Sequence, residues 1–229
     1  MKNPLVIGYK GEIGSFILNG LLKVMPKALN VWCVDINETE QEIVDRINRS
    51  DVIFLCVPLQ QTTKWIKKYK GMLQGKIIIE QCSLKEDIFN DIDDLGLDVR
   101  SMHILFRPSS TPNLSDRRLG LFPDQFNAAM VKLLKNITQS DIVWFSDISE
   151  HDKSMAINQA LVHRVLLTLG EMLKETNSNT FIGQKVVELS ERIKCGDKVL
   201  YKMIQDNRHL NGKLEEFETA LAKFDILKI

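Results

Sequence analysis

Short apolar segments alternate with segments of helical periodicity through the first two-thirds of the chain, and this alternation restricts the folds that it can adopt. The apolar segments are rich in β-branched residues, as strands that are covered on both faces must be. We predict strands at Leu5–Ile7, Val31–Val34, Val52–Val57 and Ile77–Ile79. We predict helices between and after them, at Ile13–Met25, Glu40–Asn48, Thr62–Met72 and Leu84–Asp94. The alternation predicts an α/β fold with a doubly wound parallel sheet and right-handed crossovers.

The α/β pattern ends near residue 148. Two further strands are predicted near Val99–Ile104 and Ile142–Phe145, with a polar loop, Ser109–Arg118, and a helix, Asp124–Leu134, between them. We therefore assign residues 1–148 to a first domain, and we expect the polar loop to be functional or mobile.

The second predicted domain, residues 149–229, carries only helical patterns. Ser149 and Asp152 suggest a capping-box start, and helical spacing then continues to about Glu175. Further helices are predicted at Phe181–Ile193, Lys198–Asp206 and Leu210–Phe224. The stretch MAINQALVHRVLLTLGEML is apolar on nearly all sides, so we expect its helix to be buried on most faces. About 80 residues bury a core poorly on their own, so we predict an all-α dimerisation domain and a homodimer formed through the C-terminal helices.

Charge and cysteine content argue against several classes of protein. The 229 residues include 30 basic and 30 acidic side chains, so the formal net charge is zero. We expect neither a nucleic-acid nor a membrane surface, because both attract proteins through positive charge. The 4 cysteines are scattered without metal-ligand spacing, so no metal site is predicted. The sequence shows neither an apolar signal stretch nor a membrane-spanning apolar segment, so we expect a cytoplasmic protein.

A glycine-rich turn, NPLVIGYKGEIGSF, joins the first predicted strand to the first predicted helix. Such turns bind a diphosphate through backbone N–H groups at a helix N-terminus, with glycines where a side chain would block the approach. The fingerprint G-x-G-x-x-G, counted back from Gly14, requires glycine at position 9, but this chain has Tyr9 there and a spare glycine at Gly8. Gly11 and Gly14 provide the close-approach and helix-packing glycines, whereas Tyr9 replaces the tight-turn glycine. The alternative is a tight strand-to-helix turn without a ligand.

An acidic residue follows the second predicted strand. In VWCVDIN, Asp35 lies about 20 residues beyond the last glycine, where a carboxylate accepts hydrogen bonds from the adenosine ribose of a dinucleotide. A carboxylate there repels a 2′-phosphate and no arginine lies nearby, so we expect a Rossmann-type domain that prefers NAD; a solvated strand-end aspartate is the alternative. The predicted cofactor site comprises Gly8, Lys10, Gly11, Glu12, Ile13, Gly14, Asp35, Val57 and Pro58.

Polar residues also follow later strands. Ser83 and Lys85 come just after the fourth predicted strand, and His103 lies at the end of a later one. Ligands of a doubly wound sheet bind beyond the carboxyl ends of the strands, where a histidine can hydrogen-bond a reacting hydroxyl and a serine can orient it. A structural histidine at a domain junction is the alternative for His103.

The long helix of the second domain carries a polar stripe. At 100° per residue, Asp152, Gln159 and His163 lie within about 20° of one another on one face. Polar groups on an apolar helix must find partners or line a wet cavity, because unsatisfied buried polar groups are costly. A pocket wall and a purely structural network between helices both remain open.

Four segments together resemble the prephenate/arogenate dehydrogenase family: SDVIFLCVPL, EQCSLK, HILFRP and SEHDKSMAINQALVHR. The resemblance runs from about Val6 to the end of the long helix, and it implies a dinucleotide-binding domain followed by a helical dimerisation domain. By position, it implies that His103 hydrogen-bonds the ring hydroxyl of the substrate, that Ser83 supports this contact beside the nicotinamide, and that His163 lines the substrate pocket. The implied reaction is an NAD-dependent oxidative decarboxylation in tyrosine biosynthesis. His103 takes the proton of the C4 hydroxyl as hydride leaves C4 for NAD, and loss of carbon dioxide forms a 4-hydroxyphenyl product.

The chain departs from the family pattern at several positions. Ile104 and Arg107 stand where the family has proline and glycine, and Gln184 aligns with a family arginine that binds a substrate carboxylate. Arg107 is our first candidate for that missing cation, and Lys185 and Arg192 are the alternatives. The predicted catalytic residues are His103 and Ser83, and the predicted residues for a small-molecule substrate are His163, Gln159, Arg107, Lys85 and Gln184. Two alternatives stay open: an oxidoreductase of the same fold that acts on another cyclic hydroxy acid, and a catalytically inactive dimeric NAD-binding or sensor protein.

Overall fold

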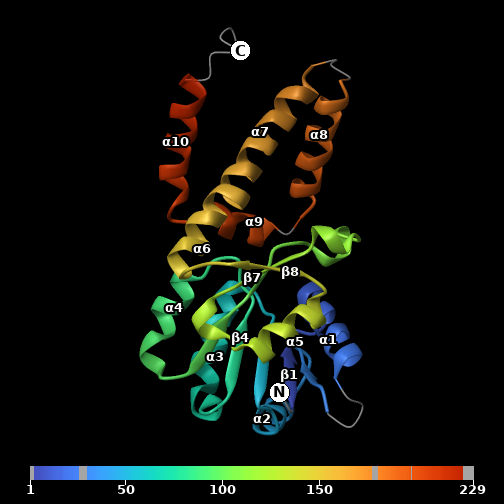
Figure 1. Ribbon diagram of the computed structural model, residues 1–229, viewed down its shortest axis with the longest axis vertical. Coiled ribbons are helices and arrows are strands. Elements are labelled where there is room, and N and C mark those ends of the chain that lie inside the picture. Colours follow the sequence, from blue (N-terminus) through green and yellow to red (C-terminus); the bar gives the residue numbers. More distant parts are fainter. Residues whose placement is uncertain (1–2, 26–29, 177–179, 197, 224–229) are drawn as a thin grey trace. The chain divides into compact units, whose positions relative to one another are not determined.

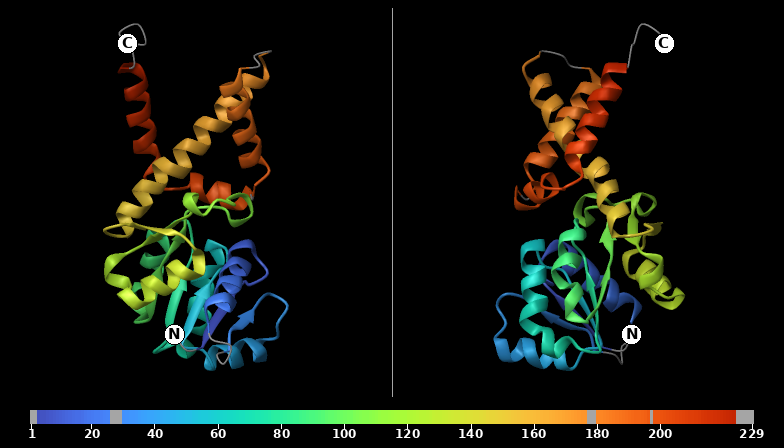
Figure 2. Two further views of the ribbon diagram at one scale, coloured as in Figure 1. Left: turned by 45° about the vertical axis from the view of Figure 1, so that its right-hand side comes forward. Right: turned by 90° about the vertical axis from the view of Figure 1, so that its left-hand side faces the viewer.

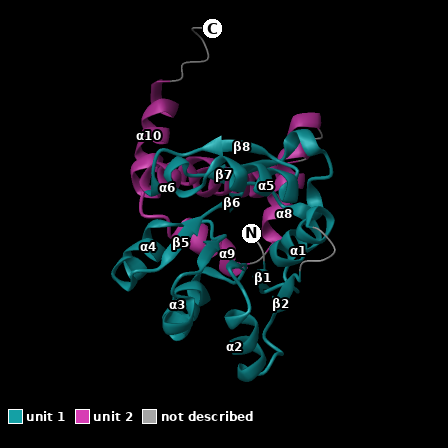
Figure 3. Cartoon of the chain, turned by 60° about the horizontal axis from the view of Figure 1, so that its bottom comes forward, with its two compact units in different colours: residues 1–148 teal, residues 149–229 magenta. Residues whose placement is uncertain are grey.

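The computed structural model describes residues 3–25, 30–176, 180–196 and 198–223. The chain divides into two compact units, Met1–Ile148 (unit 1) and Ser149–Ile229 (unit 2), which are coloured separately in Figure 3. Within the described ranges, no helix has the length and apolar character that crossing a membrane requires. The described side chains also include no group of three or more His, Cys, Asp or Glu that could hold a metal ion.

A five-stranded parallel sheet forms the centre of unit 1 (Figure 1). In the order β2-β1-β3-β4-β5, its strands are Trp32–Val34, Pro4–Ile7, Val52–Leu55, Ile77–Glu80 and Asp98–Ser101. Every neighbouring pair is parallel, and the last paired row across β1, β3, β4 and β5 consists of Ile7, Leu55, Glu80 and Ser101. The predicted doubly wound parallel sheet is therefore confirmed.

Helices cover both faces of this sheet (Figure 2). They are α1 (Glu12–Val24), α2 (Glu40–Asn48), α3 (Leu59–Leu73), α4 (Glu86–Ile92) and α5 (Ala128–Thr138). Ile53 of β3 packs in one buried cluster with Ile66 of α3, whereas its neighbour Phe54 packs in another with Ile17 of α1. Because successive strand residues point to opposite faces, the two clusters lie on opposite sides of the sheet. Two buried faces explain why the strands read as continuous apolar runs.

The start of α2 shows how the local sequence sets a helix boundary. The Thr39 hydroxyl accepts a hydrogen bond from Glu42 N at 3.3 Å, and the Glu42 carboxylate accepts one from Thr39 N at 2.8 Å. This reciprocal capping box satisfies two backbone donors that the helix itself cannot satisfy. α2 accordingly spans the predicted residues, Glu40–Asn48.

A second sheet in unit 1 corrects the predicted strand Val99–Ile104. The sheet has the order β6-β7-β8, with β6 at His103–Ile104, β7 at Arg118–Leu121 and β8 at Asp141–Trp144; β6 and β7 are antiparallel. Met102 N still donates to the Glu80 carbonyl at 3.1 Å, but the Met102 carbonyl accepts from the Lys85 ammonium at 2.9 Å. His103 then pairs with Gly120 of β7 instead of continuing β5. His103 thus begins a strand of the second sheet rather than ending a strand of the first.

The segment between β6 and α5 differs from prediction in two further respects. β7 was not predicted, because its short apolar pattern directly follows the polar loop. That loop contains the 3-10 turns Pro108–Ser110 and Leu114–Asp116. The helix predicted from Asp124 begins at Ala128, because the Asn127 side chain caps it by accepting from Met130 N at 2.9 Å.

The regular elements of unit 2 are all helices in its described residues. Its elements are α6 (Ile148–Met155), a π-helical turn (Ala156–Leu161), α7 (Val162–Lys174), α8 (Phe181–Lys194), α9 (Lys198–Gln205) and α10 (Leu210–Lys223). The predicted fold class, a parallel-sheet domain followed by an all-α part, is therefore confirmed. The predicted end of the last helix, Phe224, lies outside the described residues. Ser149 lies inside α6 and not before it, so the predicted capping-box start is wrong.

The long helix is less buried within this chain than its composition suggested. α7 packs along α8, where a Cβ on Gly170 would lie 2.3 Å from the Ser190 hydroxyl oxygen. Gly170 is the single buried residue of α7, and Leu169 and Met172 are exposed. The expectation that most of its faces are buried is therefore not met in one copy of the chain.

Candidate active site

The tight-turn glycine of the glycine-rich turn is Gly8. Its φ is +79°, and a Cβ at this position would lie 2.4 Å from the Cys56 carbonyl oxygen of the adjacent strand connection. Both the left-handed backbone and the close approach require glycine. Tyr9 has no positive φ, since Gln139 is the sole non-glycine residue with one among those described. The inference that Tyr9 replaces the turn glycine is therefore wrong: the turn keeps that glycine and is one residue longer than G-x-G-x-x-G.

The start of α1 provides the donors that a diphosphate needs. A Cβ on Gly14 would lie 2.0 Å from the Gly8 carbonyl oxygen, so that only glycine lets the helix approach the turn so closely. Gly11 is the N-cap residue and supplies no side-chain cap. Within the described chain, the N–H groups of Glu12, Ile13 and Gly14 donate to no acceptor. Three unsatisfied donors at a helix N-terminus fit a bound anion.

The side chains of Tyr9 and Lys10 lie close together beside this turn. The Tyr9 ring is half-buried and packs against the cluster on the α1 face of the sheet. The Lys10 ammonium is exposed and lies 5.5 Å from the centre of that ring. The ring thus contributes to the core, and the ammonium remains in the solvent next to the turn.

Asp35 links the end of β2 to the glycine turn. One carboxylate oxygen accepts from Lys10 N and the other from Ile36 N, both at 2.8 Å. Its own N–H donates to the Glu38 carboxylate at 2.6 Å, and Glu38 lies 3.9 Å from the Arg46 guanidinium. The sequence had indicated no nearby arginine. Arg46 reaches this region from α2, where Glu38 partly balances its charge.

Arg107 is paired with the first residue of α1. Its Nε donates to the Glu12 carboxylate at 3.1 Å, and Ser109 N donates to the other Glu12 oxygen at 2.9 Å. Burial raises the pKa of Glu12, but the hydrogen bonds from Ser109 and Arg107 outweigh it, so that the pKa lies below its usual value. The Arg107 side chain is 59% exposed. These contacts hold the polar loop against the start of α1.

Lys85 lies in a buried network below the ends of the strands. Its ammonium is 2.7 Å from the Glu80 carboxylate, and both side chains are fully buried. Glu80 also accepts from Cys82 N at 2.7 Å and from the Ser101 hydroxyl. A lysine held in this way is not available to a substrate, so the structure contradicts the prediction that Lys85 binds one.

The other candidate residues of unit 1 lie at the carboxyl edge of the parallel sheet. Val57 and Pro58 join β3 to α3, and Pro58 is the N-cap residue of α3. Ser83 follows β4 and is half-buried, and His103 follows β5 with 3% of its surface exposed. Because β4 and β5 are neighbours, Ser83 and His103 follow adjacent strand ends. Sequence analysis did not identify Glu38, which accepts from Asp35 N, or Glu80, which pairs with Lys85. Each of these glutamates lies within five residues of its partner in the sequence.

The predicted polar stripe of unit 2 is interrupted by the π-helical turn. The 100° spacing does not hold across its i→i+5 bonds, so Asp152 and Gln159 do not share the predicted face. Asp152 instead lies 2.7 Å from His151 Nδ1, and its carbonyl accepts from the Asn207 amide at 2.8 Å.

Gln159 and His163 keep unsatisfied polar atoms. Gln159 Oε1 and His163 Nδ1 are buried and have no partner in the described chain. The His163 ring stacks on Tyr201 with 6.4 Å between ring centres, and burial lowers the pKa of His163. Gln184, which aligns with the expected arginine, lies exposed in the first turn of α8. Its neighbour Lys185 pairs with Glu188 at 2.7 Å.

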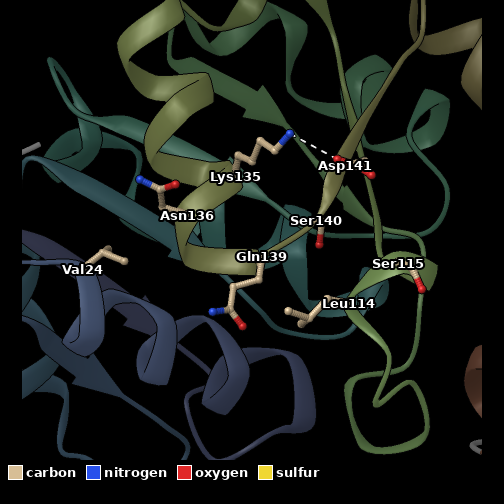
Figure 4. Close-up of a pocket in the computed structure, with 8 residues that line it drawn as sticks. All are labelled: Val24, Leu114, Ser115, Lys135, Asn136, Gln139, Ser140 and Asp141. Atoms are coloured by element: carbon tan, nitrogen blue, oxygen red, sulfur yellow. Dashed lines mark hydrogen bonds and ion pairs between the residues drawn. The ribbon is translucent and has the colours of Figure 1, made fainter.

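Unit 1 also contains a pocket of about 580 Å³, which Figure 4 shows in close-up. Its lining residues are Val24, Leu114, Ser115, Lys135, Asn136, Gln139, Ser140 and Asp141. Val24 ends α1, whereas the glycine turn precedes its first residue, Glu12. Thirteen helical residues separate the two by about 20 Å, so this pocket is not part of the candidate site.

Comparisons with known proteins agree with this arrangement. A family model described as "Prephenate dehydrogenase, nucleotide-binding domain" matches residues 25–104, a segment that begins after the glycine turn. A "Probable arogenate/prephenate dehydrogenase" of Methanocaldococcus jannaschii is 23% identical over 189 residues; the match covers 78% of this chain and 41% of that protein. The chain thus spans less than half the length of this curated relative.

Two solved structures share the fold. Prephenate dehydrogenase from A. aeolicus, in complex with hydroxyphenyl propionate and NAD+, has a TM-score of 0.75 at 17% identity, covering 97% of this chain and 89% of that one. Synechocystis arogenate dehydrogenase has a TM-score of 0.70 at 17% identity, covering 96% and 90%. The resemblance to the prephenate/arogenate dehydrogenase family that the sequence motifs indicated is therefore confirmed.

Proposed function

We propose that this chain binds NAD and catalyses the oxidative decarboxylation of prephenate or arogenate in tyrosine biosynthesis. The observation that carries the proposal is the N-terminus of α1, where three N–H groups have no acceptor among the described residues and face a turn whose glycines leave room for a diphosphate. The candidate catalytic residues follow strands of the same sheet edge. The A. aeolicus relative, whose structure contains NAD+, supports the choice of cofactor.

NAD is proposed over NADP because the β2 end is acidic. Asp35 and Glu38 lie together there, and Glu38 also lies 3.9 Å from the guanidinium of Arg46, an arginine that reaches the region from α2. A 2′-phosphate would meet two carboxylates at this position.

His103 is the proposed base. It lies at the start of β6 and is almost fully buried, so water competes little for its ring nitrogens. We expect His103 to accept the proton of the substrate hydroxyl, and Ser83 to orient that hydroxyl from the neighbouring strand end. Bound NAD would supply the hydride acceptor. Loss of carbon dioxide then yields an aromatic ring, so the side chains need mainly to position the reacting groups.

Arg107 is the proposed partner of a substrate carboxylate. Only its Nε is engaged by Glu12, which leaves both terminal nitrogens of the guanidinium for a second anion. The exposed Gln184 carries no charge and cannot provide this interaction. Position 184 carries glutamine and not arginine, and this favours an alternative substrate, another cyclic hydroxy acid with fewer carboxylates.

We also propose that unit 2 forms a homodimer. Its helices expose large apolar side chains at Leu169, Met172, Phe181, Ile182, Leu189, Phe217 and Leu221. A surface of this kind is typical of a protein interface. Ile182→Glu should convert a dimer to a monomer in sedimentation experiments, whereas the control Leu22→Glu, an exposed leucine on α1, should not. A wild-type monomer at micromolar concentration would refute the proposal.

The activity is tested by following NAD reduction with prephenate and with arogenate. His103→Asn should lower turnover by about 10²- to 10⁴-fold and leave NAD affinity nearly unchanged, because the proton acceptor is lost but the cofactor turn is intact. His209→Asn, in unit 2, serves as the histidine control. No turnover of either substrate by a folded protein that binds NAD would favour the second candidate function, a catalytically inactive NAD-binding protein.

A further inference from the structure

Gln81 carries a buried side-chain amide without partners. Its Nε2 and its Oε1 are both shielded from solvent, and neither has a hydrogen-bond partner in the described chain. Leaving both groups of a buried amide unsatisfied is costly, and such groups in folded proteins nearly always meet a partner. The missing partner must accept one hydrogen bond and donate another.

Gln81 lies in a row of residues that crosses the edge of the sheet. The last paired row contains Val34, Ile7, Leu55 and Glu80 on β2, β1, β3 and β4. The parallel ladder continues by one residue, because Gly8 N donates to the Val34 carbonyl at 2.8 Å and Cys56 N donates to the Ile7 carbonyl at 2.9 Å. These two bonds place Asp35, Gly8 and Cys56 side by side, and the β3–β4 register, extended by one residue past Leu55 and Glu80, sets Gln81 next to Cys56.

This row follows the expected course of a dinucleotide. Asp35 stands at the proposed adenosine end, and Gly8 stands in the proposed diphosphate turn. Gln81 lies two strands beyond Gly8, or about 10 Å at the usual strand spacing. A ribose and a pyridine ring can span that distance, so Gln81 stands on the nicotinamide side.

Gln81 also lies on the correct face of the sheet. Glu80 points toward Lys85, which precedes α4, and Cys82 points toward Thr62 of α3 at 3.2 Å. Since strand side chains alternate, Gln81 points to the opposite face, which α1 covers. Its neighbour in the row, Cys56, is a neutral thiol, because burial raises its pKa. No adjacent charge in this row therefore competes for the amide.

We infer that the Gln81 amide recognises the carboxamide of the nicotinamide ring, with Nε2 donating to the carboxamide oxygen and Oε1 accepting from its NH₂ group. This inference rests on the proposed NAD site. A carboxamide satisfies both atoms, whereas a carboxylate or a phosphate only accepts and would leave Oε1 unpaired. Gln81 is thus a specificity residue for the intact nicotinamide.

The test compares three probes by calorimetric titration. They are NAD, the 3-acetylpyridine analogue of NAD, in which a methyl group replaces the NH₂, and ADP-ribose, which lacks the pyridine ring. The wild type should prefer NAD to the analogue by roughly tenfold, because the analogue leaves Oε1 unpaired again. Gln81→Leu should bind NAD roughly tenfold more weakly and should lose the preference over the analogue. Its affinity for ADP-ribose should stay within about twofold of the wild type. Gln74→Leu, an exposed glutamine at the end of α3, is the matched control and should leave all three affinities unchanged.

Two results would overturn the inference while the cofactor site stands. One is an unchanged preference for NAD over the analogue in Gln81→Leu. The other is an equal loss of ADP-ribose affinity, which would mean that Gln81 acts on the diphosphate half or on the fold. If wild-type protein binds neither NAD nor ADP-ribose, the proposed function fails and this assignment fails with it.

Discussion

Replacing Lys85 by methionine separates a structural role from a substrate-binding role. Lys85 and Glu80 are fully buried, with 2.7 Å between ammonium and carboxylate. The substitution removes this ion pair and the hydrogen bond to the Met102 carbonyl, and it leaves a carboxylate buried without its cation. Breaking a buried pair on one side typically costs about 3–5 kcal/mol. That is a large part of the roughly 5–15 kcal/mol that stabilises an ordinary domain.

Urea unfolding followed by tryptophan fluorescence measures this cost in the correct unit, because all 3 tryptophans, Trp32, Trp65 and Trp144, lie in unit 1. Lys135→Met is the matched control, since Lys135 pairs with Asp141 at 3.1 Å on the surface. Its effect should stay below about 1 kcal/mol. Adding Glu80→Gln to Lys85→Met should recover part of the loss, because the double variant no longer buries an unpaired charge. A Lys85→Met protein within about 1 kcal/mol of wild type, but with a raised KM for substrate, would show that Lys85 contacts the substrate after all.

Three further predictions concern single contacts. Gly14→Ala should destabilise unit 1 by about 1–3 kcal/mol in urea unfolding, because its Cβ would lie 2.0 Å from the Gly8 carbonyl oxygen, and titration should show weakened NAD binding. Glu12→Gln should lower the free energy of unfolding by no more than about 1 kcal/mol, because the ion pair of Glu12 with Arg107 is half-exposed. Since the pKa of Glu12 is lowered in the folded state, the wild type should lose its extra stability over the variant as the pH falls through the carboxyl range. Equal acid sensitivity of the two proteins would contradict this account. Burial lowers the pKa of His163, so the unfolded chain takes up its proton first and wild-type stability should fall as the pH drops below 6.5. His163→Gln should reduce that loss in thermal unfolding followed by circular dichroism, and an unchanged pH profile would show that His163 does not contribute.

The parts of the fold that depend on near neighbours in the sequence were predictable. The β-branched runs formed the parallel sheet, because strands covered on both faces need continuous apolar residues. The boundaries of α2 followed from Thr39 and Glu42, three residues apart, which cap each other. Asp35 could be located at the end of its strand for the same reason, because near neighbours in the sequence form both the apolar pattern of the strand and the glycine turn before it.

What the sequence by itself determined was therefore the order and type of the elements, and the tertiary structure decided the role of individual side chains within them. Gly8 is the turn glycine because the carbonyl of Cys56, 48 residues away, leaves no room for a Cβ. The strand predicted through Ile104 ends early because the Lys85 ammonium donates a hydrogen bond to the Met102 carbonyl. The same hydrogen bond holds Lys85 in the interior, where it cannot bind a substrate. Periodicity is set by residues a few positions apart, whereas burial, close approach and charge pairing depend on atoms that only folding brings together.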